Sequence, residues 1–135
     1  MTDHQEIDRL IQLYSHIVDG RQWDRLGELF AETGGFEADG TGLSYHGFEK
    51  LKDYLSSFPA HPYVHYHTNV VIDVEEGADR AAASYHVFGP HTDGTAVIAT
   101  CHDTFVRTDA GWRFELHKPT IRERYWTAGG TAPTT

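Results

Sequence analysis

Residues 6–26 read EIDRLIQLYSHIVDGRQWDRL, and this stretch predicts the helical layer on which the rest of the chain packs. Apolar side chains recur at intervals of three and four, which is the pattern of a helix with one buried face. They are Ile7, Leu10, Ile11, Tyr14, Ile17 and Val18. Asp3 and Glu6 have the spacing of a capping box at the start of this helix, and Gly20 indicates its end.

Two further helices are predicted after this one. The apolar residues of the first are Trp23, Leu26, Leu29 and Phe30. It ends near residues 34–35, where two glycines follow each other, and a brief strand or turn region covers residues 36–45. The apolar residues of the last helix are Phe48, Leu51, Tyr54 and Leu55. Pro59 and Pro62 close it.

The second half of the chain is rich in Val, Ile, Thr, Tyr and Phe and is divided by short turn sequences. Four strands are predicted, at residues 65–74, 80–88, 95–107 and 112–122. Helices first and strands afterwards indicate an α+β fold, with three N-terminal helices packed on a strongly curved antiparallel sheet. Such a cone leaves its open end unfilled, which is a natural small-molecule pocket.

The composition disfavours several classes of protein and of binding partner. The 135 residues suffice for one domain, and 20 acidic against 11 basic residues give a net charge of −9. That sign disfavours nucleic acid and anionic membrane surfaces as partners. No apolar run is long enough to span a bilayer, and the N-terminus lacks signal-peptide features. The single cysteine, Cys101, excludes an internal disulfide, so the expected location is cytoplasmic. We predict one domain over residues 1–126 and a flexible tail over residues 127–135.

The ten histidines are the unusual feature of the composition, and two of them lie on one predicted strand. Because side chains alternate along a strand, His65, His67, Asn69 and Val71 share a face. That face is either a solvated surface or the polar lining of a cavity. Two histidines on one face also suit a metal ion. No further ligand follows at the spacing of a known site, so no metal is expected.

Asp19 lies at the end of the first predicted helix, where it is either a solvated carboxylate or a functional one. Several strands each contribute a histidine, and these are His86, His91, His102 and His117. The chain has no serine elbow, phosphate-binding loop or dinucleotide-binding glycine motif. Cys101 is interpreted as a small buried residue.

Several segments resemble one known family. Residues 18–26, VDGRQWDRL, resemble the first-helix motif of the scytalone dehydratase group, which belongs to the SnoaL-like, NTF2-like proteins. Residues 65–69, HYHTN, are similar to a strand of that group and of the hexachlorocyclohexane dehydrochlorinase. YHVFGPH, WRF and KPTIR, which begin at residues 85, 112 and 118, resemble further dehydratase segments. The resemblance covers residues 6–126 and implies the NTF2-like cone.

The same resemblance implies roles for individual residues. Asp19 and His65 would form the catalytic dyad, and His91 would be a second catalytic histidine that contacts a substrate oxygen. Thr100 and His102 would line the pocket, where the dehydratase has a serine and an asparagine.

This chain departs from the dehydratase in its tyrosines. The dehydratase has a tyrosine immediately before its aspartate, where this chain has Val18, and another near the position of Ala38. Tyr14, one helical turn before Val18, is the candidate replacement. His67 and Asn69 are expected to contact substrate as well.

The chemistry of these groups predicts a general base. A neutral His65 with Asp19 on its other ring nitrogen can take a proton next to an electron-withdrawing group. Hydrogen bonds from His91, His102 or Tyr14 would stabilise the resulting enolate-like charge. The expected function is a cofactor-independent lyase, specifically a dehydratase of a small aromatic or polyketide-like compound. The alternatives are an isomerase, cyclase or epoxide hydrolase on the same cone, and a non-catalytic ligand-binding domain. A homodimer or homotrimer is expected, because the outer face of the sheet needs cover.

Overall fold

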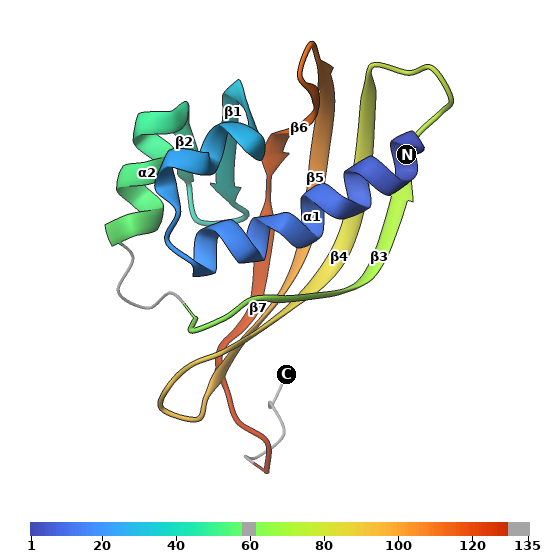
Figure 1. The fold of residues 1–135 in the computed structure, drawn as a ribbon. Helices are drawn as coiled ribbons and strands as arrows, with labels where there is room; N and C mark the ends of the chain where they lie inside the picture. Colours follow the sequence, from blue (N-terminus) through green and yellow to red (C-terminus); the bar gives the residue numbers. More distant parts are fainter. Residues whose placement is uncertain (58–61, 130–135) are drawn as a thin grey trace.

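The computed structural model of the protein describes residues 1–57 and 62–129 (Figure 1). Within these residues the helices are α1 (Asp3–Asp19), the 3₁₀ helix η1 (Trp23–Glu28) and α2 (Phe48–Ser57). The strands are β1 (Phe30–Ala38), β2 (Leu43–His46), β3 (Tyr66–Asp73), β4 (Arg80–Pro90), β5 (Ala96–Thr108), β6 (Gly111–His117) and β7 (Pro119–Trp126). None of the described helices combines the length and apolar character needed to cross a bilayer.

The N-cap of helix α1 is Thr2, one residue before the predicted capping box. The Thr2 hydroxyl accepts the backbone N–H of Gln5 at 3.1 Å, and the Gln5 side chain accepts the N–H of Thr2 at 2.8 Å. These reciprocal bonds satisfy two backbone donors at the helix start. The prediction of Asp3 and Glu6 as the capping pair was therefore wrong. The Asp3 carboxylate instead accepts hydrogen bonds from Arg107 at 2.9 and 3.1 Å, which ties the helix to β5.

The second predicted helix is shorter than expected. It is the 3₁₀ helix η1, and Phe30 already begins β1, so Gly34 and Gly35 lie inside a strand. The pairing of β1 with β6 shifts register between Phe30 and Gly35. A Cβ added at Gly34 would lie 2.7 Å from the carbonyl oxygen of Phe114, and one at Gly35 would lie 2.3 Å from the imidazole of His46. Glycine is therefore required here by close approach of neighbouring strands rather than as a helix stop. Helix α2 agrees with its prediction; Pro59 lies outside the described residues.

The strands form one sheet in the order β2-β1-β6-β5-β4-β3, and β7 also pairs with β5. Consecutive strands from β3 to β6 pair antiparallel, which confirms the predicted meander. The pairing of β1 with β6 is parallel, which the sequence analysis did not anticipate. Strand β1, which follows α1 and η1 and precedes the meander in the chain, lies along β6, the last strand of the meander.

The single strand predicted over residues 112–122 is two strands that meet at Lys118. The backbone N–H of Lys118 donates to the Asp103 carboxylate at 2.8 Å, and its carbonyl accepts the N–H of His102 at 3.0 Å. Strand β6 pairs with residues 104–108 of β5, and β7 pairs with residues 96–101. The long strand β5 thus changes partner along its length, and the sheet curves at this point (Figure 1).

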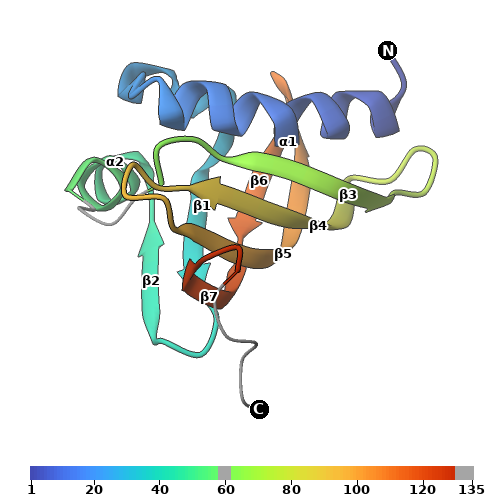
Figure 2. The same cartoon turned by 90° about the horizontal axis from the view of Figure 1, so that it is seen from below.

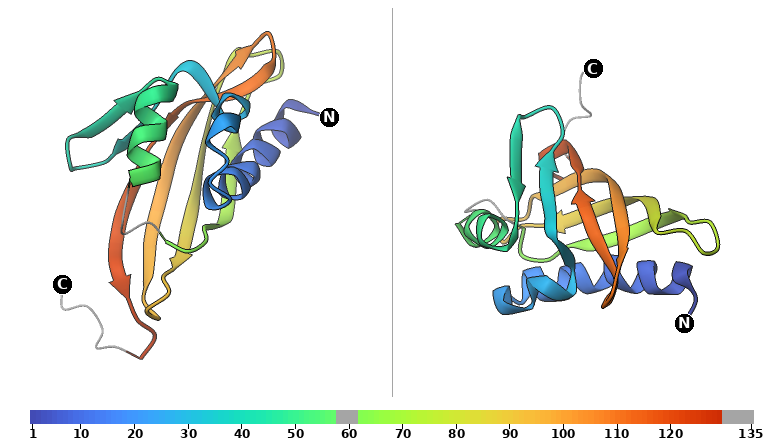
Figure 3. Two further views of the ribbon diagram at one scale, coloured as in Figure 1. Left: turned by 60° about the vertical axis from the view of Figure 1, so that its left-hand side comes forward. Right: turned by 90° about the horizontal axis from the view of Figure 1, so that it is seen from above.

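Helix α1 runs across one face of the curved sheet, and α2 lies beside the edge formed by β1 and β2 (Figure 2 and Figure 3). Ile7, Ile11 and Ile17 of α1 are fully buried, as are Phe105 and Phe114 of the sheet. Burial of each such side chain contributes roughly 1.5–3 kcal/mol to folding. Three helices on an unclosed, curved sheet confirm the predicted α+β cone. The predicted tail follows β7 directly, and its residues 130–135 lie outside the described part of the chain.

Candidate active site

Asp19 and His65 contact each other through two hydrogen bonds. Helix α1 ends at Asp19, and His65 lies immediately before β3. The Asp19 carboxylate receives His65 Nδ1 at 2.5 Å through one oxygen and the backbone N–H of His65 at 2.8 Å through the other. The carboxylate therefore holds the proton on Nδ1, so the lone pair of the neutral ring lies on Nε2. Both side chains are largely buried.

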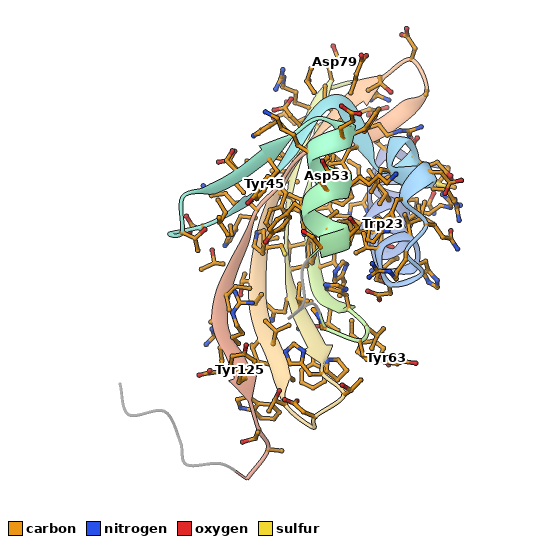
Figure 4. The ribbon with its side chains drawn as sticks, turned by 90° about the vertical axis from the view of Figure 1, so that its left-hand side faces the viewer. Trp23, Tyr45, Asp53, Tyr63, Asp79 and Tyr125 are labelled. Atoms are coloured by element: carbon orange, nitrogen blue, oxygen red, sulfur yellow. The ribbon has the colours of Figure 1, made fainter. Side chains whose placement is uncertain are left out.

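His65 is part of the wall of a cavity between the helices and the sheet. The cavity has a volume of about 800 Å³, its open mouth included. Its walls are mostly apolar, with Phe36, Val97 and Ile121 among them. Asp19 is not among the described lining residues of this cavity, and it lines a second pocket together with His65. Figure 4 labels Tyr63 and Tyr125 at one end of the sheet, next in sequence to the lining residues Pro62 and Arg124.

Tyr14 lies among the polar side chains of the cavity. Its ring centroid is 6.1 Å from that of His65, 5.8 Å from His67 and 4.5 Å from His117. Burial raises the pKa of the Tyr14 hydroxyl well above its ordinary value, and the charge of Asp103 adds to the effect. The hydroxyl therefore stays protonated and is able to donate a hydrogen bond. The structure thus brings Tyr14 and His65 together, as the sequence predicts.

His67 is buried and holds one defined tautomer. Its Nδ1 lies 2.9 Å from the carbonyl oxygen of Ile11, so Nδ1 carries the proton and donates it. Nε2 has no hydrogen-bond partner among the described residues. Burial lowers the pKa of His67 to about 4, which keeps the ring neutral near pH 7. His67 is thus a lining residue of the cavity whose Nε2 is a buried acceptor.

The sequence analysis missed a buried network on the sheet side of the cavity. The Tyr85 hydroxyl donates to the Asp103 carboxylate at 2.5 Å, and His117 Nδ1 lies 2.9 Å from the same oxygen. The other carboxylate oxygen accepts the backbone N–H of Lys118. Asp103 continues the inward-facing series of β5 after Cys101, and this alternation was the signal that could have identified it.

Cys101, Asp103 and His117 place one ligand atom each within 4.8 Å of one another, a separation that suits a metal ion. Both Asp103 oxygens already accept hydrogen bonds. Burial raises the pKa of the Cys101 thiol well above its ordinary value, which disfavours the thiolate that binds metals. We therefore interpret this cluster as a hydrogen-bonded network.

A model of the SnoaL-like domain matches residues 1–117 of the chain. The chain belongs to the SnoaL-like family. No curated protein matches this SnoaL-like chain at a significant level.

Solved structures resemble the SnoaL-like domain over nearly its whole length. An NTF2-like protein with a cystatin-like fold from Novosphingobium aromaticivorans has a TM-score of 0.74 and 24% identity, over 96% of this chain and 84% of that one. The hexachlorocyclohexane dehydrochlorinase LinA-type3 from Novosphingobium barchaimii LL02 has a TM-score of 0.75 and 21% identity, over 98% of this chain and 94% of that one. A protein provisionally named a scytalone dehydratase from Novosphingobium aromaticivorans DSM 12444 has a TM-score of 0.71 and 20% identity, over 96% of this chain and 95% of that one. These likenesses confirm the NTF2-like fold.

Four predicted site residues of the SnoaL-like domain lie away from the cavity. Asn69 has a φ of +56° at a register shift in β3, so the strand reverses its faces there and Asn69 is exposed. Thr100 and His102 alternate with the inward residues of β5 and therefore point to the opposite face of the sheet. His91 lies at the β4–β5 turn with Nε2 3.2 Å from the carbonyl oxygen of Arg124. None of the four is among the described lining residues.

Proposed function

We propose that this SnoaL-like protein is a cofactor-independent lyase, which takes a proton from one carbon and expels a leaving group from the next. The hydrogen-bonded pair of Asp19 and His65 at the cavity wall carries this proposal. A histidine held in one tautomer by a carboxylate is a general base whose protonated form that carboxylate stabilises.

In the proposed step, His65 Nε2 takes a proton from the carbon next to a carbonyl group. The C–H electron pair moves onto the carbonyl as an enolate, and the Tyr14 hydroxyl donates a hydrogen bond to that oxygen. The enolate electrons then form the carbon–carbon double bond and expel the leaving group from the neighbouring carbon. Asp19 stabilises the positive charge on His65 throughout. The step needs no metal or organic cofactor.

The cavity favours a small aromatic or polyketide-like substrate. Apolar walls suit a ring system. Two structural neighbours are named as a dehydrochlorinase and a dehydratase, which are eliminating enzymes, and this supports the reaction class.

Elimination of fluoride from 4-fluoro-4-(4-nitrophenyl)butan-2-one tests the base, because the aromatic ketone fits the proposed substrate class and fluoride leaves without a proton. Formation of the conjugated enone is followed by absorbance. His65→Asn keeps a donor for Asp19 and removes the basic nitrogen, so the rate should fall on the order of 100-fold or more. Asp19→Asn should lower it about tenfold or more, because the imidazolium loses its counter-charge.

The matched control is His86→Asn, which removes an exposed histidine on the outer face of β4. Its rate should equal that of the wild-type protein. A folded His65→Asn variant, verified by circular dichroism, that eliminates fluoride as fast as the wild type would refute the proposed function.

A further inference from the structure

The cavity contains a second histidine held by a buried carboxylate, and its ring, like that of His65, lies near Tyr14. His117 lines the cavity, and its Nδ1 lies 2.9 Å from the Asp103 carboxylate. That contact leaves Nε2 as the ring nitrogen available to a ligand. Asp103 is 1% exposed and His117 is 4% exposed. The arrangement repeats that of His65 with Asp19 and is the more deeply buried of the two.

Both oxygens of the Asp103 carboxylate are held by hydrogen bonds. Three donors point to this carboxylate, from the Tyr85 hydroxyl, His117 Nδ1 and the Lys118 backbone. Burial and the charge of Asp103 raise the pKa of Tyr85 well above its ordinary value, so Tyr85 remains a donor. A carboxylate fixed in this way holds the His117 ring in place and stabilises it when protonated.

Several other polar groups on the cavity wall are poor proton donors. His67 has its only proton engaged with the Ile11 carbonyl, and burial lowers its pKa to about 4. Burial raises the pKa values of Tyr14 and Cys101, which makes both weaker acids. The guanidinium of Arg124 does not deprotonate in proteins. His117 differs from these groups in its geometry, because Asp103 holds Nδ1 and leaves Nε2 as the nitrogen that can carry a proton to a ligand in the cavity.

We propose that His117 is a second proton-transfer residue of the site, which protonates a departing hydroxyl group while Asp103 and Tyr85 hold it in position. This rests on the proposed lyase function and deepens it, because it assigns the leaving group as a hydroxyl. A hydroxyl group leaves poorly as hydroxide and readily as water. The substrate class is therefore a β-hydroxy carbonyl compound bound between His65 and His117.

The proton and electron balance of the step is complete. His65 takes the proton from the carbon, and the C–H electron pair becomes the new carbon–carbon double bond. The C–O bond breaks with its electron pair on oxygen, and that oxygen takes the proton of His117 Nε2 and leaves as water. His65 ends protonated and His117 ends neutral, and exchange of one proton each with solvent restores both.

Two ketones that differ only in the leaving group separate the roles of the histidines. The probes are 4-hydroxy-4-(4-nitrophenyl)butan-2-one and its 4-fluoro analogue, which yield the same enone. Only the hydroxy compound needs a proton on its leaving group. The measured quantity is the ratio of kcat/KM for the hydroxy probe to that for the fluoro probe.

His117→Asn keeps an amide donor for Asp103 and removes Nε2, so this ratio should fall about 100-fold. Tyr85→Phe keeps the ring and loosens Asp103, so the ratio should fall by a smaller factor. In His65→Asn both rates should fall together and leave the ratio near its wild-type value. An unchanged ratio in folded His117→Asn, or in Tyr85→Phe should the first variant not fold, would overturn the role of His117. Loss of rate with His65→Asn would still support the base.

Nitrogen-15 NMR of the histidine rings tests the inference without turnover. In the His65→Asn variant, which should not consume it, the hydroxy probe is added in increments. The proposal requires His117 Nδ1 to carry a proton and the His117 Nε2 resonance to shift saturably. An unprotonated Nδ1, or an Nε2 resonance that does not respond to the probe, would overturn the proposal whatever the kinetic result.

Discussion

Acid should destabilise the protein through His67, and the size of the effect follows from its environment. His67 is buried and neutral, with its Nδ1 proton donated to the Ile11 carbonyl. Its pKa is about 4 in the folded protein, against an ordinary value of 6.5. The unfolded chain therefore binds one more proton than the folded chain between these two pH values, so the free energy of unfolding falls as the pH falls. From pH 7 to pH 4 the loss from this residue is about 3 kcal/mol.

Urea unfolding followed by tryptophan fluorescence at pH 7 and pH 4 measures this loss. Because other groups also titrate in this range, the comparison is with His67→Asn, whose amide keeps a donor for the Ile11 carbonyl and does not ionise. The wild-type protein should lose about 3 kcal/mol more than this variant between the two pH values. His86→Asn, which removes an exposed imidazole, should follow the wild-type profile. Parallel losses in the wild type and His67→Asn would refute the assignment of a buried neutral His67.

Further predictions concern the buried network, the helix cap, the β4–β5 turn and assembly. Asp103→Ala leaves its three buried donors without an acceptor and should lower the free energy of unfolding by about 3–5 kcal/mol in urea titrations. Thr2→Ala removes the acceptor of the capping box and should cost about 1 kcal/mol by the same assay. His91→Gln should leave kcat/KM for the fluoro ketone unchanged, since His91 contacts the Arg124 carbonyl rather than the described cavity lining; a large loss would restore it to the site. Light scattering should give a homodimer or homotrimer, because Tyr66 and Trp126 are exposed on the described chain, and a monomer at micromolar concentration would contradict this.

Apolar spacing predicted the parts of the fold that local physics determines. The helical face of α1, from Ile7 to Val18, is buried as expected, and the strand-rich second half forms the expected meander. The contact of Asp19 with His65 was accessible from the resemblance, since both residues lie in motifs. The sequence did not show which residues of β3 after His67 point toward the interior, because the left-handed backbone of Asn69 reverses the alternation.

The hydrogen-bonded network around Asp103 could not be predicted from the sequence for a different reason. Tyr85, Asp103 and His117 lie on three strands, and their contact depends on the register of β5 against β4 and β6. A shift of one residue exchanges the two faces of a strand. The sequence analysis placed Thr100 and His102 toward the pocket, which is the opposite alternation to the observed one. The alternation along β5 indicates that Asp103 faces inward, but it does not identify the partners of Asp103 on β4 and β6.

The Asp103 carboxylate contacts both the backbone and a cavity side chain at the point where β6 ends and β7 begins. One of its oxygens receives the Lys118 backbone at the bend, and the other receives the His117 ring that borders the cavity. A change at Asp103 therefore alters the course of the backbone and the orientation of the imidazole together. The wall residues Phe36, Val97 and Ile121 have no such double attachment, because they meet the cavity through apolar side chains alone. Substitutions at those apolar wall residues can therefore change which ligand binds without moving the backbone. A substitution at Asp103 changes the polar end of the cavity and the curvature of the sheet together.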